Sequence, residues 1–131
     1  MTFLLEERLE GRFHLLRPAE ISERLGKVDA SLVLCGHSHN AQLVGIPGGP
    51  LIVNPGSVGC PLYAEGPDAP ISNARSPHAR YAIVESDVQG RWSAQFHQVD
   101  YDWETQARLA LAHGRPDWVV PLRSGRVGVA T

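Results

Sequence analysis

The stretch Ser31-Leu32-Val33-Leu34-Cys35-Gly36-His37-Ser38-His39 decides how the rest of the chain is interpreted. Its first half is an apolar run between Asp29 and Gly36, which predicts a strand buried on both faces of a sheet. Two histidines follow where that strand ends. In open α/β sheets, ligand sites lie beyond the carboxyl ends of the strands. The stretch therefore predicts a strand that leads into a candidate metal site.

His37 and His39 are the candidate metal ligands. Two residues apart on a strand they would point to opposite faces, but in a turn at the strand's end both rings can converge. Gly36 favours such a turn, because it lacks a Cβ. Imidazole binds manganese, iron, zinc, nickel and cobalt, so the pair does not choose the metal. The plain alternative is two surface histidines in a polar loop.

Other metal sites built on His-x-His fit this sequence less well. A cupin needs a glutamate a few residues further on, where Leu43 and Val44 stand. A metallo-β-lactamase needs an aspartate and a histidine directly after the pair, where Asn40 and Ala41 stand. A mononuclear site of Cys35, His37 and His39 is a third alternative, although a buried free cysteine is most often a small hydrophobe.

The flanking sequence predicts a helix, about five strands and a further helix. Periodicity, turn residues and caps place these elements. We expect a first helical segment over 3–16, a helix from Pro18 to Gly26, strands at 31–35, 41–46, 51–54, 81–84 and 91–99, a long loop over 55–77, a helix from Asp102 to Gly114 and a helical turn at 116–122. The predicted fold class is α/β, a mixed β-sheet layer with flanking helices, in a single domain over 1–131.

Composition narrows the class of protein. The chain has 131 residues, 43% hydrophobic and 20% charged, with a net charge of −2 and two cysteines. These values indicate a globular domain without a basic nucleic-acid footprint or a disulfide framework. The N-terminus lacks the pattern of a signal peptide, and no apolar stretch is long enough to span a bilayer. We therefore expect a cytoplasmic protein with no membrane partner.

A second motif, Val53-Asn54-Pro55-Gly56-Ser57-Val58-Gly59, follows one hairpin after the histidines. Together, the Gly-His-x-His and Asn-Pro-Gly-Ser-Val motifs resemble the C-terminal half of small bacterial metallophosphoesterases of the calcineurin-like superfamily. The segments 76–82 and 101–104 are also similar to one of its subgroups, so the resemblance covers essentially the whole chain.

The resemblance implies a fold and a reaction. Members have an α/β/β/α sandwich with two divalent metals at the edge where the sheets meet, and they hydrolyse phosphate mono- or diesters. It implies that His37 binds the second metal and His39 the first. Asn54 to Gly59 would form a structural turn under the site, and Ser57 is not expected to be a nucleophile. His78 and Arg80, in the long loop, are weaker candidates for contact with substrate phosphate.

The sequence departs from the family in its other metal ligands. It has no Asp-x-His, no Gly-Asn-His and no histidine ahead of the Pro18 helix except His14. We therefore expect the isolated chain to be incomplete and inactive, with no catalytic residue of its own to assign. We favour a start placed at an internal methionine over a true fragment. A true fragment would act as an interaction module, or would pair with a separate N-terminal half or a second copy.

Overall fold

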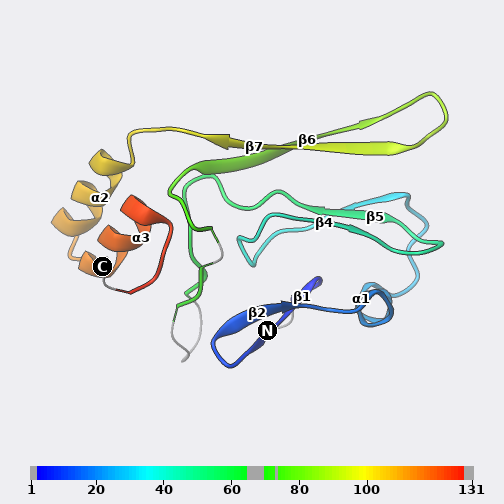
Figure 1. Ribbon diagram of the computed structural model, residues 1–131, viewed down its shortest axis with the longest axis horizontal. Helices are drawn as coiled ribbons and strands as arrows, with labels where there is room; N and C mark the ends of the chain where they lie inside the picture. The colour runs from blue at the N-terminus through cyan, green and yellow to red at the C-terminus, as the bar shows by residue number, and fades with distance from the viewer. Residues whose placement is uncertain (1–2, 65–69, 73, 129–131) are drawn as a thin grey trace.

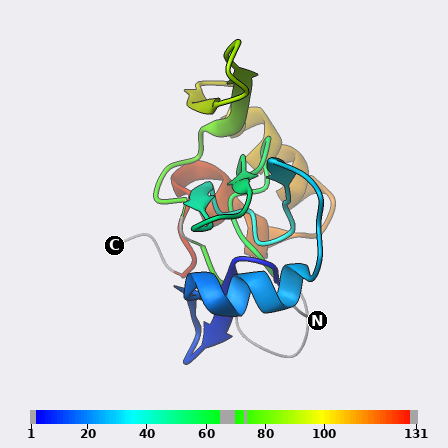
Figure 2. The same ribbon diagram turned by 90° about the vertical axis from the view of Figure 1, so that its right-hand side faces the viewer.

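The computed structural model describes residues 3–64, 70–72 and 74–128. Figure 1 shows the chain in tiers, with a long hairpin above a small sheet and a second hairpin and a helix below it. Figure 2 shows the same order from the side. The elements are the strands β1 (Glu6–Leu9), β2 (Arg12–Leu15), β3 (Leu32–Leu34), β4 (Gln42–Gly45), β5 (Leu51–Asn54), β6 (Ala79–Ser86) and β7 (Trp92–Val99), and the helices α1 (Pro18–Leu25), α2 (Trp103–Ala112), η1 (Pro116–Trp118, a 3₁₀ turn) and α3 (Val119–Ser124).

The fold class is mixed α/β, as predicted. The middle tier is a sheet in the order β3-β5-β4, in which β3 runs parallel and β4 antiparallel to β5. The hairpins β1–β2 and β6–β7 each form a two-stranded sheet. The predicted hairpins over 41–54 and 81–99 are confirmed, with β4 and β5 in the first and β6 and β7 in the second.

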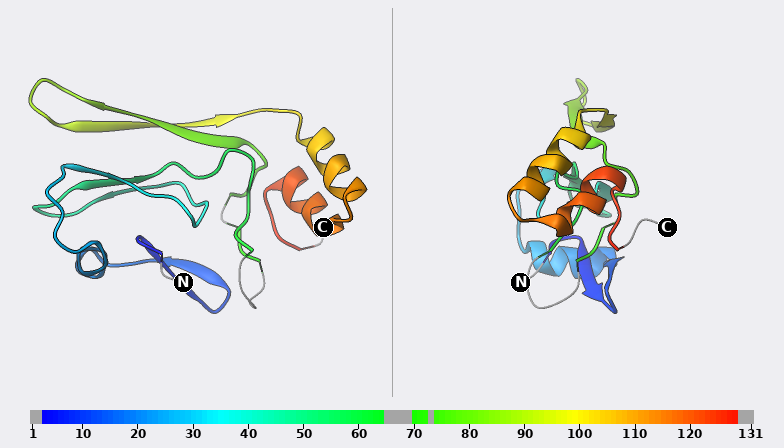
Figure 3. Two further views of the ribbon diagram at one scale, coloured as in Figure 1. Left: turned by 180° about the vertical axis from the view of Figure 1, so that it is seen from behind. Right: turned by 90° about the vertical axis from the view of Figure 1, so that its left-hand side faces the viewer.

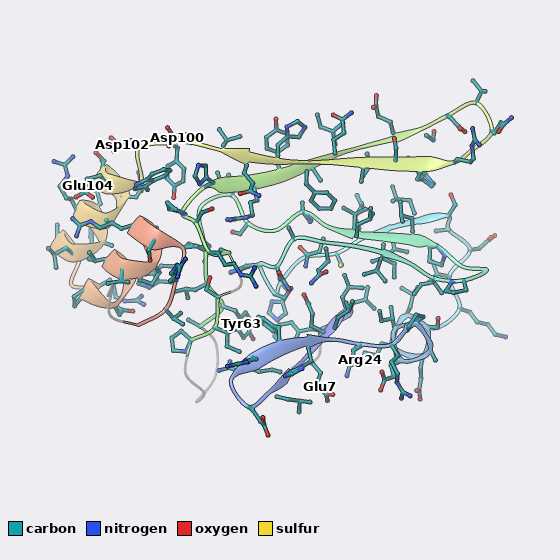
Figure 4. The ribbon with its side chains drawn as sticks, in the orientation of Figure 1. Glu7, Arg24, Tyr63, Asp100, Asp102 and Glu104 are labelled. Atoms are coloured by element: carbon teal, nitrogen blue, oxygen red, sulfur yellow. The ribbon has the colours of Figure 1, made fainter. Side chains whose placement is uncertain are left out.

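The main core lies between the lower tier and the middle sheet. Its centre is formed by Leu5, Leu16, Ile21 and Ile52, with Ile21 and Ile52 fully buried. Arg24 ties α1 to the chain before β1, because its guanidinium donates to the carbonyls of Phe3 at 2.7 Å and Glu6 at 3.0 Å. Figure 4 shows Arg24 on α1 and Glu7 on the neighbouring strand. The hydrogen bonds of Arg24 hold α1 against the start of β1, and the core around Ile52 joins this tier to the middle sheet.

The prediction of a helix over 3–16 was wrong, because this segment forms the β1–β2 hairpin. Leu9 pairs with Arg12, so Glu10 and Gly11 make a two-residue turn. Their φ angles are 50° and 73°, as a type I′ hairpin turn requires. The glycine accepts this conformation at little cost, and the strands on either side then pair over four residues each. The scattered leucines obscured this short turn signal.

The prediction that the strand at 31–35 is buried on both faces was also wrong. The strand exists as β3, but it pairs only with β5, and Leu34 is 64% exposed. The β6–β7 hairpin likewise has no fully covered face. Trp92 and Ala94 are half-buried, but Phe96 on the same face is 39% exposed. The main core covers the face of β3 that carries Val33, whereas Leu34 on the opposite face is exposed.

The predicted helices at Pro18 and Asp102 are confirmed. Pro18 opens α1, and Asp102 caps α2 by accepting a hydrogen bond from the Thr105 amide at 3.0 Å. The helical turn predicted at 116–122 extends to Ser124, because η1 is followed directly by α3. Figures 1 and 3 show α2 and α3 together at one end of the molecule. There Arg123 and Glu104 form an ion pair at 2.5 Å.

Candidate metal centre

The candidate metal ligands lie in a short loop that leaves β3 at Gly36. His37 and His39 both have positive φ angles, of 75° and 59°. A residue with a Cβ adopts this left-handed conformation only at a cost of about 1–2 kcal/mol. Two such residues so close together need compensating interactions, and the surrounding polar side chains supply them.

Asn54 is the first of these side chains, and it joins the two sequence motifs. Its amide nitrogen donates to the carbonyl of Gly36 at 3.2 Å and to Ser38 Oγ at 3.1 Å. Its Oδ1 accepts from the amide of Gly56 at 3.1 Å. Asn54 and Ser38 are both buried, at 1% and 3% exposed. The resemblance implied a structural role for the Asn54 turn, and this geometry supports that role.

The ring of His39 is oriented by the backbone. Its Nδ1 lies 2.5 Å from the carbonyl oxygen of Leu62. Because a carbonyl can only accept, Nδ1 carries the proton in this contact. Histidines that bind metals in proteins are commonly held in this way by a carbonyl at the other nitrogen. The Leu62 carbonyl therefore fixes the orientation of the His39 ring.

His37 is oriented by aromatic rings. It stacks on Phe3 with ring centroids 5.1 Å apart, and the edge of Tyr63 meets it at 5.3 Å. Tyr63 also reaches the ring of His39 at 6.3 Å. Figure 4 shows Tyr63 between the loop that follows β5 and the lower hairpin. One buried tyrosine thus contacts both candidate ligands and keeps them on the same side of the loop.

Glu6 completes the support of the loop from below, and the sequence did not single it out. It is 2% exposed, and the side chain of Asn40 donates to its Oε1 at 2.8 Å. Burial raises the pKa of Glu6, while hydrogen bonds from Ser38, Asn40 and Gln42 act in the opposite direction. The residue was missed because its position at the start of a strand appears only once the hairpin is known.

The described residues do not complete a metal site around the two histidines. Within the described parts of the chain, no three side chains of the types His, Cys, Asp or Glu are grouped to hold one ion. Cys35 lines an apolar hollow of about 390 Å³ together with Leu34, Val53, Ala82 and Val84. Burial, reinforced by the charge of Glu6, raises its pKa to about 11. The cysteine is placed as an apolar side chain beside the loop.

Arg80 has a structural role that sequence reasoning did not foresee. It is 8% exposed, and its guanidinium donates to the carbonyls of Ala74 at 2.7 Å and His78 at 2.8 Å. Burial lowers its pKa. The guanidinium is therefore committed to the backbone of its own loop, which does not favour the weaker expectation that Arg80 contacts substrate phosphate. Ser57 Oγ likewise accepts from the amide of Cys60 at 3.1 Å, as a turn residue does.

No family model matches this sequence, and no curated protein matches it. Among the described residues, no helix is both long and apolar enough to cross a membrane. The resemblance to metallophosphoesterases stays a prediction from the two sequence motifs.

Proposed function

We propose that this chain is the C-terminal part of a metal-dependent phosphoesterase. In it, His37 and His39 each bind one of two divalent metal ions, and the reaction is hydrolysis of a phosphate mono- or diester. The observation that carries the proposal is the short loop after β3, which presents two imidazoles one residue apart, with the His39 ring held at Nδ1 by the Leu62 carbonyl. A pair of divalent ions supplies charge neutralisation for attack on phosphorus.

In this proposal, the described chain positions two of the metal ligands. The strained loop holds two imidazoles in fixed orientations, and Asn54 and Tyr63 hold the loop. Two imidazoles are too few for two adjacent cations, which also need bridging and terminal carboxylates or histidines. We therefore propose that the remaining ligands come from a further segment or a partner chain, and that the isolated chain is inactive.

The test uses the protein isolated from its source cells, together with its intact mass. We expect a mass above 14.3 kDa and manganese-dependent hydrolysis of bis(p-nitrophenyl) phosphate. H37A and H39A made in that protein should each lower the rate by at least about 100-fold, because each removes a metal ligand. H97A is the matched control, since His97 stacks on Tyr81 in the upper hairpin and should leave the rate unchanged.

Absence of any metal-dependent hydrolysis by the native protein would overturn the proposal. So would equal losses in H37A and H97A, because both would then act through the fold. A mass of 14.3 kDa with activity would show that the missing ligands come from a second chain.

A second candidate function is an interaction module without catalysis. The hollow beside Cys35 and the exposed Leu34 favour it, because they leave apolar surface open next to the free edge of β3. Sedimentation of the purified chain tests this candidate. A concentration-dependent shift that is abolished by L34K supports association, and a monomer at all concentrations contradicts self-association.

A further inference from the structure

A polar hollow of about 640 Å³ lies beside the histidine loop. Its lining comes from the β1–β2 turn and the start of β2, from the chain around the start of β4, and from the segments on either side of residue 73 and near the C-terminus. The described lining residues are Gly11, Arg12, Phe13, Asn40, Gln42, Ile71, Ser72, Arg75 and Val127. The hollow adjoins the candidate metal centre in two ways. Asn40 directly follows His39, and Ile71 pairs with Tyr63, whose ring contacts both histidines.

Two arginines make the lining of this hollow positively charged. Arg12 and Arg75 both line it, both are exposed, and neither guanidinium has a hydrogen bond or ion pair within the described part of the chain. The other polar side chains are already engaged. Asn40 donates to Glu6 at 2.8 Å, and Ser72 Oγ donates to the carbonyl of Gly125 at 2.7 Å. No acidic side chain is among the described residues that line the hollow.

The backbone around Arg75 is held in place before any ligand arrives. Arg75 has a φ of 62°, its amide donates to the carbonyl of Gly125 at 3.1 Å, and Ala74's amide donates to Ser72 Oγ at 3.1 Å. The buried Arg80 binds the Ala74 carbonyl on one side of it, and Ser76 Oγ on the other at 3.0 Å. A side chain presented from a fixed backbone loses less conformational entropy when it binds.

We propose that this hollow binds a phosphate group of the substrate, with Arg12 and Arg75 as its donors. A phosphate oxyanion supplies the negative charge that no described lining residue provides, and it accepts paired hydrogen bonds from guanidinium groups. The inference rests on the proposed function for the identity of the ligand as substrate. It narrows the substrate class to compounds with more than one phosphate, one at the metal centre and one in the hollow.

The first experiment measures binding of inorganic pyrophosphate to the 131-residue chain, without metal, by calorimetry and by amide chemical shifts. We expect shifts at residues 11–13, 40–42 and 71–75, and binding that weakens with salt. R12Q and R75Q should each weaken binding about tenfold, because each removes a charge-assisted hydrogen bond. R91Q is the matched control, with the same charge change at the far tip of the upper hairpin, where Arg91 pairs with Asp87.

The outcomes separate this inference from the proposed function. Absence of binding by the wild-type chain, equal weakening in R91Q, or loss of binding only in H37A and H39A would each overturn the hollow as a phosphate site. None of these results bears on hydrolysis, because no metal is present. Should R12Q unfold, the chemical shifts of the wild-type chain still locate the binding.

The second experiment uses the native enzyme and compares two substrates. R75Q should raise KM for a nucleoside diphosphate at least several-fold more than it raises KM for p-nitrophenyl phosphate. Equal effects on the two substrates would contradict the assignment of a second phosphate. A native protein with no hydrolysis at all would overturn the proposed function and, with it, the identity of this ligand as a substrate.

Discussion

The side-chain amide of Asn54 donates a hydrogen bond to Ser38 Oγ at 3.1 Å, with both residues buried. This contact joins the end of β5 to the middle of the histidine loop, sixteen residues earlier in the chain. Ser38 separates two left-handed histidines, so the bond acts at the point where the loop is most strained. Asn54 is thus the residue through which the second motif determines the shape of the first.

The Asn54 network should be costly to remove. N54A deletes two donated hydrogen bonds and leaves the Gly56 amide without its partner. Unpaired buried polar groups cost about 1–3 kcal/mol each, so we expect N54A to lower the free energy of unfolding by about 2–3 kcal/mol. S57A, which removes only the acceptor for the Cys60 amide, should cost under about 1 kcal/mol. Urea unfolding measures both, and equal losses would contradict the central role of Asn54.

Gly56 should tolerate a methyl group far less well than Gly90. Both have left-handed φ angles, of 87° and 75°. A Cβ on Gly56 would lie 3.1 Å from the side chain of the buried Arg80, whereas one on Gly90 would meet open space. G90A should therefore cost about 1–2 kcal/mol from the backbone alone, and G56A about 3 kcal/mol or more. Similar losses in thermal unfolding would show that Arg80 moves aside.

The buried carboxyl group of Glu6 should make the free energy of unfolding depend on pH. Burial raises its pKa in the folded state, so the folded chain binds this proton more tightly than the unfolded chain does. The stability it contributes is fully present below the unfolded pKa, near 4.5, and is lost as pH rises through the higher folded value. Wild type should therefore gain stability relative to E6Q as pH falls from 7 toward 5. Urea unfolding of both proteins over this range checks it, and a constant or reversed difference would contradict the burial of a charged group here.

Cys35 should be slow to react with alkylating reagents in the folded chain. Its pKa of about 11 leaves only about one thiol in a thousand as thiolate at pH 8, and the thiolate is the reactive form. In a C60S variant, iodoacetamide labelling followed by mass should be slow at pH 8 and accelerate about tenfold per pH unit. Denaturant should restore fast labelling at pH 8. Rapid labelling of the folded chain would place Cys35 in an open, polar setting.

A substitution in the turn of the β1–β2 hairpin should stabilise the fold. Glu10 occupies a left-handed position with a φ of 50°, next to Gly11. Asparagine adopts this conformation more readily than glutamate, and Asn-Gly is a preferred pair in type I′ turns. E10N should raise the free energy of unfolding by about 0.5 kcal/mol. Destabilisation by E10N would indicate that the Glu10 side chain makes a contact of its own.

Much of the local structure could be predicted from residue patterns. Pro18 and Asp102 mark helix starts whose reasons are local, since a fixed φ and a side-chain cap act within one turn. The hairpins around 47–50 and 87–90 follow from turn residues between alternating strands. The hairpin at Glu10 was missed for the opposite reason. Its signal is two residues long, and scattered leucines on either side resemble a helical face.

The interactions that hold the histidine loop in place depend on the tertiary structure. Residue patterns were enough to predict that two imidazoles follow a strand and that an Asn-Pro-Gly turn comes one hairpin later, because backbone propensities and short motifs are local properties. That Asn54 holds Ser38, that Leu62 orients His39, that Glu6 lies beneath Asn40 and that Arg80 is committed to its own loop all depend on residues distant in the chain. Hydrogen-bond partners and burial are set by how the elements pack, and no pattern along one strand or loop contains that information.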